Sequence, residues 1–318
     1  MFQNDNDNAI IDLLDKRVRK QEQRRHFFRK SAGLTAGLAT GVILGACGSS
    51  GDDAVAQTGP TDPEILNFAL NLEYLEAQFY QMAAYGRTLP ANLLTGAGRQ
   101  GAVSGGHIVP FKDPLVAAYA KEIADDEVAH VAFLRAALGS AAVAQPAINI
   151  DGASATGAFS VAARAAGLIT AGQTFDPYAD DNSFLLGAYI FEDVGVTAYK
   201  GASPLIQNKT FLEAAAGILA AEAYHAGLVR AVLYSKGLTS QAQAISDARD
   251  SLDGATDLDQ GIGTATVSNI VPLDANGIAY SRTPGQVLNI VFLNKAAVTQ
   301  GGFFPAGVNG TLAMSAPN

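Results

Sequence analysis

Apolar residues recur at helical spacing in four segments of the chain, which we predict to be the long helices of one bundle. The first two segments begin at an acid followed by proline, Asp62-Pro63 and Asp113-Pro114, with the acid as the expected N-cap. A glycine follows the first, second and fourth segments, as is common after helix ends. The predicted helices span about 62–85, 113–138, 183–200 and 208–236.

The lengths of the connections predict how these helices are arranged. Residues 87–112 contain five glycines and form a loop, and residues 201–207 form a short loop. Residues 140–182 form a long crossover with a short helix near 159–168, which lets the third long helix lie parallel to the second. We therefore predict an all-α, ferritin-like four-helix bundle over 62–237, made of two antiparallel helix pairs joined by a long crossover.

Residues 238–318 differ in character, because they are rich in Gly, Asp, Thr and Asn. We predict short helices at 239–252 and 284–295 and an irregular C-terminal extension that packs on the bundle. Nothing in this segment resembles a catalytic motif.

The N-terminal residues resemble an export signal. A basic region containing Arg24-Arg25 precedes a short, weakly hydrophobic run over 32–46, which is too short to cross a bilayer comfortably. The pattern resembles a bacterial twin-arginine signal over 1–46. Leu44-Gly45-Ala46-Cys47 resembles a lipobox, so we expect a lipid anchor at Cys47, a tether over 47–61, and a periplasmic or cell-envelope location. The alternative is that Cys47 only happens to lie in this segment.

Composition and charge exclude several classes of protein. Hydrophobic residues make up 48% of the 318-residue chain, enough for a substantial core. The net charge is −9, and without residues 1–46 the chain holds 13 basic and 25 acidic residues, so a nucleic-acid partner is not expected. The single cysteine cannot form an intramolecular disulfide or a four-cysteine metal centre.

Two predicted helices contain a Glu-x-x-His motif, Glu127 to His130 and Glu222 to His225. Residues three apart share one helix face, so each motif directs a carboxylate and an imidazole to one point. The alternative is two solvated surface pairs. Ile123 lies beside the first motif and apolar residues also flank the second, so we expect both to face the core, where coordination to a metal ion stabilises a carboxylate.

A dinuclear site also needs a carboxylate from each remaining helix. Aligned without gaps, the segments 72–80 and 191–199 match Glu73 with Glu192, whereas Glu76 matches Gly195. We therefore predict Glu73 and Glu192 as ligands that bridge the two ions, and Glu76 as a neighbouring carboxylate or an extra ligand. The predicted metal ligands are Glu73, Glu127, His130, Glu192, Glu222 and His225.

Other polar residues are given other roles. Tyr80 and Tyr199 return to the face of these glutamates, where each either holds a liganding carboxylate, takes part in redox chemistry, or only fills the core. We expect Asp193 to face away from the site and His107 to lie on the surface.

The order Glu, Glu-x-x-His, Glu, Glu-x-x-His resembles the di-iron carboxylate proteins of the ferritin-like superfamily, which include bacterioferritin and rubrerythrin. Residues 66–80 and 281–291 resemble more narrowly the ferritin-like, desiccation-related proteins of bacteria and plants. The resemblance implies oxidation of Fe(II) by dioxygen or peroxide, or removal of peroxide, at two Fe ions. Manganese catalases use a related bundle, so two Mn ions are the alternative cofactor.

A second hypothesis is a non-enzymatic envelope stress protein with a structural metal site. A lipidated tether and a long C-terminal extension do not suit a closed storage shell, and a homodimer remains open as the assembly.

Overall fold

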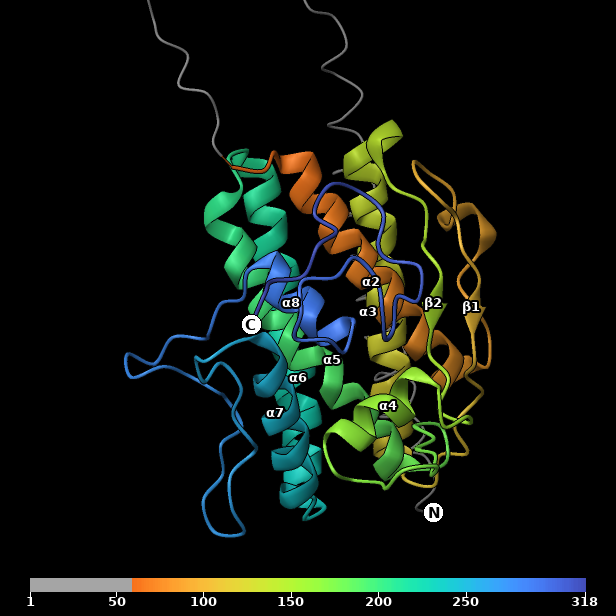
Figure 1. Ribbon diagram of the computed structural model, residues 1–318, viewed down its shortest axis with the longest axis vertical. Helices are drawn as coiled ribbons and strands as arrows, with labels where there is room; N and C mark the ends of the chain where they lie inside the picture. Colours follow the sequence, from red (N-terminus) through yellow and green to blue (C-terminus); the bar gives the residue numbers. More distant parts are fainter. Residues whose placement is uncertain (1–58) are drawn as a thin grey trace, which may run out of the picture. The chain divides into compact units, whose positions relative to one another are not determined.

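The computed structural model of the protein describes residues 59–318, so the expectations for the export signal and most of the tether fall outside it. Four long helices form the core of this part, and the other helices are shorter (Figure 1). The long helices are α2 (Asp62–Tyr85), α3 (Pro114–Leu138), α5 (Asp181–Ala202) and α6 (Lys209–Ser235).

Contacts between the helices give their directions. The amide of Gln81 in α2 donates to the Ala124 carbonyl of α3, whereas nearer the start of α2 the Tyr74 hydroxyl bonds Arg135, so α2 and α3 are antiparallel. The α2 and α5 helices are also antiparallel, because residue 80 of α2 bonds residue 192 of α5 and residue 73 bonds residue 199. α3 and α5 are therefore parallel, which confirms the predicted ferritin-like topology.

The helix ends follow the predicted chemistry with one correction. Asp113 caps α3 by accepting from the Leu115 N–H at 3.0 Å. The N-cap of α2 is Thr61 and not Asp62, because Glu64 reaches back to the Thr61 N–H at 2.8 Å. Asp62 instead accepts the N–H groups of residues 207 and 208, each at 2.8 Å, and so ties the start of α2 to the loop before α6.

The two long connections of the bundle touch each other, which the sequence did not predict. The strand β1 (Val103–Ser104) pairs in parallel with β2 (Ile148–Asn149). Two residues per strand are too few for a hydrophobic alternation to be visible in the sequence. The crossover also holds the short helix α4 (Ala158–Ala165), and 3₁₀ turns lie at Ala91–Leu93, Gly139–Ala141 and Ser203–Leu205.

The C-terminal extension packs on the bundle through α7 (Thr239–Asp253) and α8 (Pro284–Val291). α8 is shorter than predicted, because Leu293 adopts a left-handed backbone with φ of 52°. The Arg282 N–H donates to the Thr197 carbonyl of α5 at 3.0 Å. At this crossing a Cβ on Gly201 would lie 2.0 Å from the Arg282 carbonyl oxygen, so the close approach requires glycine.

A set of buried ion pairs, which we call the tail network, joins this extension to α5 and α6. Asp193 pairs with Arg230 at 2.7 Å and with Arg249 at 2.9 Å. Arg249 also pairs with Asp259 at 2.5 Å. The full network consists of Asp193, Asp253, Asp259, Arg230, Arg249 and Arg282, all of them buried.

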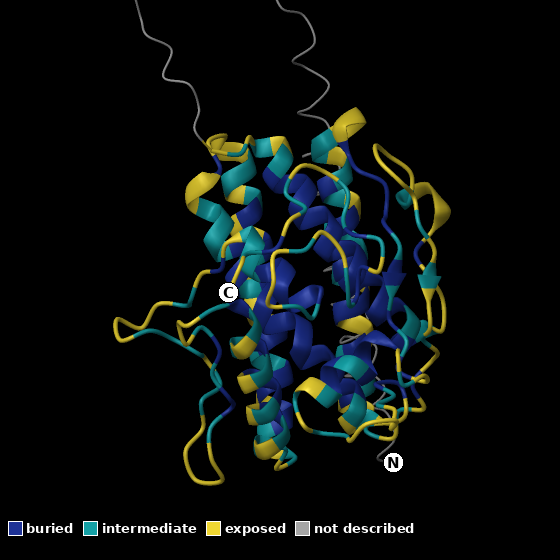
Figure 2. Cartoon of the chain, viewed as in Figure 1, coloured by how far each residue is buried: buried dark blue, intermediate teal, exposed yellow. Residues whose placement is uncertain are grey.

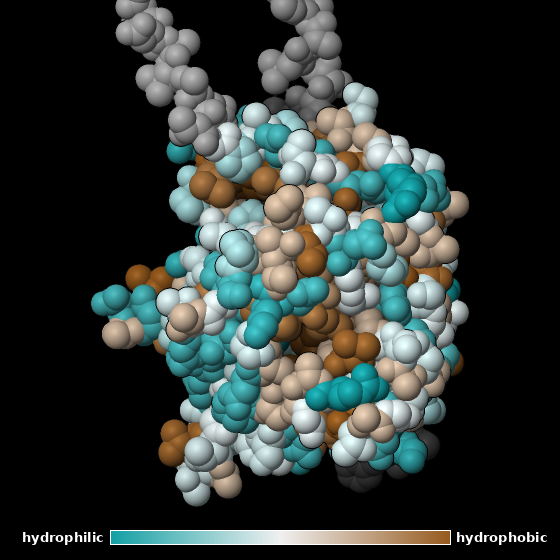
Figure 3. Space-filling model, in the orientation of Figure 1, coloured by the Kyte–Doolittle hydropathy of each residue, from teal (hydrophilic) through white to brown (hydrophobic). Residues whose placement is uncertain are grey.

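Burial is concentrated where the long helices meet (Figure 2). On the face drawn in Figure 3, hydrophilic and weakly polar residues cover most of the surface, with smaller apolar patches between them. In the part of the chain that the structure describes, α6 is long and apolar enough to span a membrane by length and composition. In this fold α6 is a bundle helix that packs against α5 and buries Glu222 and Arg230.

Candidate metal centre

The six predicted ligands converge at one point inside the bundle. Each of the four long helices supplies at least one of them, and all are buried except His130, whose side chain is 12% exposed. These residues are Glu73 from α2, Glu127 and His130 from α3, Glu192 from α5, and Glu222 and His225 from α6.

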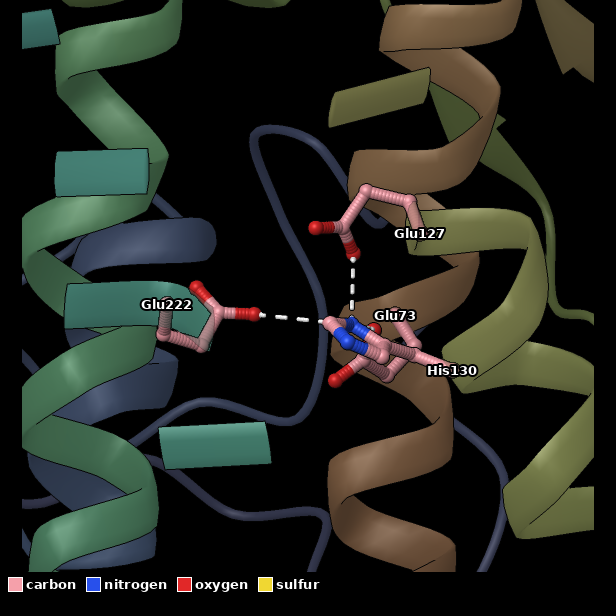
Figure 4. Close-up of side chains that lie close together, drawn as sticks. All are labelled: Glu73, Glu127, His130 and Glu222. Carbon is pink, nitrogen blue, oxygen red and sulfur yellow. Dashed lines mark ion pairs between the residues drawn. The ribbon is translucent and has the colours of Figure 1, made fainter. Parts of the chain in front are cut away.

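One group of ligands surrounds His130 (Figure 4). Its Nδ1 lies 3.2 Å from Glu73 Oε2 and 3.5 Å from Glu127 Oε2. Glu222 approaches from the opposite side, with Oε1 at 4.0 Å. These four side chains offer ligand atoms that all lie within 4.8 Å of one another, which is close enough to hold one metal ion.

A second group surrounds His225. Its Nδ1 lies 3.2 Å from Glu127 Oε1 and 3.6 Å from Glu192 Oε2. Glu192, Glu222 and His225 again offer ligand atoms within 4.8 Å of one another.

The two groups share the glutamates of the Glu-x-x-His motifs. Glu222 belongs to both groups, and Glu127 places one oxygen beside each histidine. Glu73 lies beside His130 and Glu192 beside His225, so this geometry favours Glu127 and Glu222 as the shared carboxylates, and bridging by Glu73 and Glu192 stays a prediction. The alignment of helix segments showed which residues share a level along the bundle, but not which of them lie between the two histidines.

Glu76 adds a fifth carboxylate to this cluster. It is buried, and its Oε2 has no hydrogen-bond partner. A Cβ on Gly195 would lie 2.3 Å from Glu222 Oε2, so the glycine of α5 makes room for that carboxylate, whereas Glu76 Oε1 at 3.6 Å would be in ordinary contact. The glycine that the alignment sets opposite Glu76 therefore has a steric cause, which is the approach of Glu222.

The two tyrosines hydrogen-bond across the bundle. The Tyr80 hydroxyl of α2 donates to Glu192 Oε1 of α5, and the Tyr199 hydroxyl of α5 donates to Glu73 Oε1 of α2. Each bond occupies one oxygen of a terminal carboxylate and leaves Oε2 directed at a histidine. The tyrosines thus fix the rotation of the carboxylates in addition to filling the core.

Two other sequence expectations concern residues outside this cluster. Asp193 follows Glu192 and faces away from the site, as expected, but it is buried in the tail network. His107 lies on the surface and pairs with Asp176 at 2.9 Å. Asp126, which the sequence analysis did not single out, lies 3.5 Å from His225 Nε2.

The family model of the ferritin-like domain matches residues 61–235, more than half of the chain. The chain belongs to the ferritin-like domain family. It is similar to the ferritin-like catalase Nec2 of Nesocodon mauritianus, with 27% identity over 280 residues, covering 79% of this chain and 85% of that protein. It is also 30% identical over 249 residues to the desiccation-related protein PCC13-62 of Craterostigma plantagineum, covering 72% and 76% of the two chains, which supports its place in the desiccation-related subfamily. No solved structure matches this chain significantly.

Burial in this ferritin-like bundle disfavours the ionised form of the clustered glutamates, which changes their pKa values. Burial raises the pKa of Glu73 to about 7 and that of Glu192 to about 8. Burial and the other carboxylates raise the pKa values of Glu76 and Glu222 well above the usual range. Burial would also raise the pKa of Glu127, but the adjacent histidines outweigh it and lower that pKa below its usual range.

For the two histidines, burial and the neighbouring carboxylates shift the pKa in opposite directions, and the carboxylates outweigh burial. Burial would lower the pKa of His130, but Glu73 and Glu127 raise it well above its usual value. The pKa of His225 is raised to about 10, because its contacts with Asp126 and Glu127 outweigh burial. Among residues 59–318, no lysine or arginine forms an ion pair with any of the five clustered glutamates.

The atoms that face one another in this ferritin-like site are also those without hydrogen-bond partners. Buried polar atoms normally find a partner, so a group of unpartnered ones needs an explanation. The unpartnered atoms of the site are Glu73 Oε2, Glu76 Oε2, both oxygens of Glu127, Glu192 Oε2, Glu222 Oε2, and Nδ1 of His130 and His225. Carboxylate oxygens and imidazole nitrogens are metal ligands, so this donor set fits a pair of cations.

Proposed function

We propose that this ferritin-like protein holds two iron or manganese ions and consumes hydrogen peroxide with them. The proposal rests on one observation: five buried glutamates and two histidines face one another, and no lysine or arginine of the described chain neutralises them. A buried carboxylate that lacks a cation must stay protonated or bind a metal ion. With Glu76 in its protonated form, two divalent ions balance the four remaining negative charges.

The donor set favours particular metals. Oxygen ligands outnumber imidazole nitrogens, which suits iron or manganese better than copper or zinc. Glu73 and His130 would hold one ion, and Glu192 and His225 the other. Glu127 and Glu222, which lie between the two histidines, would contact both.

Peroxide removal is the reaction that this site supports best. A pair of redox-active ions would take two electrons from one peroxide, releasing dioxygen, and return them to a second peroxide, which with two protons gives two water molecules. This balance needs no other reductant, and the single cysteine of the chain does not supply a four-cysteine electron-transfer centre. One relative bears the name ferritin-like catalase.

The protein's own side chains would orient the reaction and hold its protons. Tyr80 and Tyr199 keep the Oε2 atoms of Glu192 and Glu73 turned toward the histidines. Burial and its acidic neighbours raise the pKa of Glu76 well above the usual range, which favours its protonated form. Its position beside Glu222 makes it the group that we expect to pass this proton to peroxide and recover it.

The experiment compares metal content with turnover. We expect the purified protein to contain about two Fe or Mn ions per chain by elemental analysis, and to release dioxygen from peroxide faster than it oxidises Fe(II). Glu127→Ala and Glu222→Ala should abolish metal binding and dioxygen release. The matched controls Glu122→Ala and Glu213→Ala, at exposed positions of the same two helices, should leave both unchanged. A stable, correctly folded protein that never binds Fe or Mn would contradict the proposal.

A second candidate is a structural metal site in a protein that protects cells during drying. The relative named as desiccation-related favours it. In that case the protein binds metal without releasing dioxygen or oxidising Fe(II), and Glu127→Ala lowers thermal stability and survival of drying together.

We also propose that the folded protein is exported to the periplasm or cell envelope and anchored there by lipid at Cys47. The paired arginines 24 and 25 and the sequence Leu44-Gly45-Ala46-Cys47 support this. Replacing both arginines by lysine should keep the protein in the cytoplasm on cell fractionation. Cys47→Ser should release it from the membrane fraction, and an unchanged distribution of both variants would contradict export by this route.

A further inference from the structure

The two Glu-x-x-His motifs differ in charge at the residue that precedes each glutamate. Asp126 stands before Glu127 in α3, whereas Ala221 stands before Glu222 in α6. The two motifs therefore place an acid and a methyl group at matching positions of the two helices.

Asp126 contacts the histidine of the opposite motif. Its Oδ2 lies 3.5 Å from His225 Nε2, and the side chains of His225 and Asp126 are 7% and 25% exposed. The other ring nitrogen, Nδ1, faces Glu127 and Glu192 inside the cluster. The His225 ring thus lies between a carboxylate outside the site and the ligand atoms inside it.

His130 has no equivalent contact. All of its ion pairs start from Nδ1 and run to glutamates of the cluster. Within residues 59–318, no carboxylate lies within 4.0 Å of His130 Nε2. Ala221, in the position that matches Asp126, cannot supply one. The site is nearly symmetric in its ligands but asymmetric in what holds its histidines.

We propose that the two metal positions have unequal affinities, with the position at His225 the tighter one and Asp126 the positioning residue responsible. The inference rests on the proposed dinuclear site. A carboxylate at Nε2 keeps the proton on that nitrogen, so the lone pair of Nδ1 points at the metal, and it makes the imidazole a stronger donor. Loss of such a partner typically costs 10-fold to 100-fold in metal affinity, about the difference that we expect between the two positions.

The test measures both binding steps in the full-length protein after its metal has been removed with a chelator. Mn²⁺ is added under calorimetry, and the bound ions are followed by electron paramagnetic resonance. Wild type should bind two ions in two resolved steps. Asp126→Asn should weaken the tighter step by about 10-fold to 100-fold and leave the other step unchanged, so that the steps merge. Circular dichroism and the melting temperature check that each variant is folded.

Two further variants make the test specific. Asp125→Asn removes the same charge one residue earlier, where the carboxylate is exposed and accepts from the Tyr85 hydroxyl at 3.1 Å, and it should change neither step. Ala221→Asp restores the missing acid at the matching position, which is partly exposed, and it should tighten the weaker step.

Several results would overturn the inference while leaving the proposed function intact. They are two equal steps in wild type, an equal loss in both steps for Asp126→Asn, or the same loss for Asp125→Asn. A wild-type protein that binds neither Mn²⁺ nor Fe²⁺ would instead overturn the proposed function and this inference with it.

Discussion

Two buried clusters of charged side chains meet different faces of α5. Their negative charges are compensated in different ways. Glu192 faces the metal centre, and the next residue, Asp193, faces the tail network. The tail network sets three carboxylates against three guanidinium groups from the same chain. The metal centre sets five carboxylates against two imidazoles.

This difference shows which cluster is complete. Arginine keeps its charge at any pH that a protein meets, so the tail network stays paired without outside help. The centre has no such partner in the described chain, and burial raises the pKa values of four of its five glutamates, which favours their protonated forms. A buried site that the chain leaves uncompensated is one where an added cation is stabilising.

The largest effect should come from unbalancing the tail network. Arg249→Met removes a guanidinium that pairs with both Asp193 and Asp259 and leaves those buried carboxylates under-compensated. We expect the free energy of unfolding to fall by about 3 to 5 kcal/mol in urea denaturation followed by circular dichroism. Lys121→Met, at an exposed position of α3, should change it by less than about 0.5 kcal/mol. Equal losses in the two variants would show that the network does not act as a unit.

Metal removal should affect only the centre. At a free metal concentration of about 100 times Kd, binding should add about 2.7 kcal/mol to stability, measured by urea unfolding with and without chelator. Glu127→Ala should lose this increment, because its carboxylate lies beside both histidines. Arg249→Met should keep the increment despite its lower stability, and loss of the increment there would show that the two clusters are not independent.

The metal-free protein should lose stability as pH rises. The unfolded pKa of both Glu73 and Glu192 is 4.5, and the folded values are about 7 and about 8. Between these limits the folded state keeps protons that the unfolded state has released, so their contribution is full below pH 4.5 and lost above about pH 8. Each carboxyl should cost about 1.4 kcal/mol per pH unit in its window. Urea unfolding at several pH values gives the slope of the unfolding free energy against pH. Glu73→Gln should remove the contribution of Glu73 to this slope. An unchanged slope would show that Glu73 does not cause the loss of stability.

The smallest effect should come from the tyrosines. Tyr80→Phe removes the hydrogen bond to Glu192 and should cost about 1 kcal/mol of unfolding free energy. Tyr199→Phe should do the same through Glu73, because the two bonds are equivalent across the bundle. A catalytic redox role would instead appear as a large loss of dioxygen release at unchanged metal content, which separates the two interpretations.

The sequence predicted the four long helices and the cluster of side chains between them, because helical spacing and the two Glu-x-x-His motifs are local patterns. It did not predict that Glu127 and Glu222 lie between the histidines, since this depends on how far apart the helices pack. The contact of Asp126 with His225 and the ion pairs of Asp193 were not predicted, for a related reason. An acid beside a ligand looks like an ordinary solvated residue until the partner from another helix is known.

The crossing of Arg282 over α5 has a consequence for how the chain is assembled. Arg282 donates to Thr197 from a position 85 residues later in the sequence. A chain emerging from the ribosome completes all four bundle helices, including Arg230, well before Arg249 is available as the second partner of Asp193 and Arg282 as a cover for α5. The growing bundle therefore holds Asp193 with Arg230 alone during synthesis, and α5 reaches its final packing only when most of the C-terminal extension has been made.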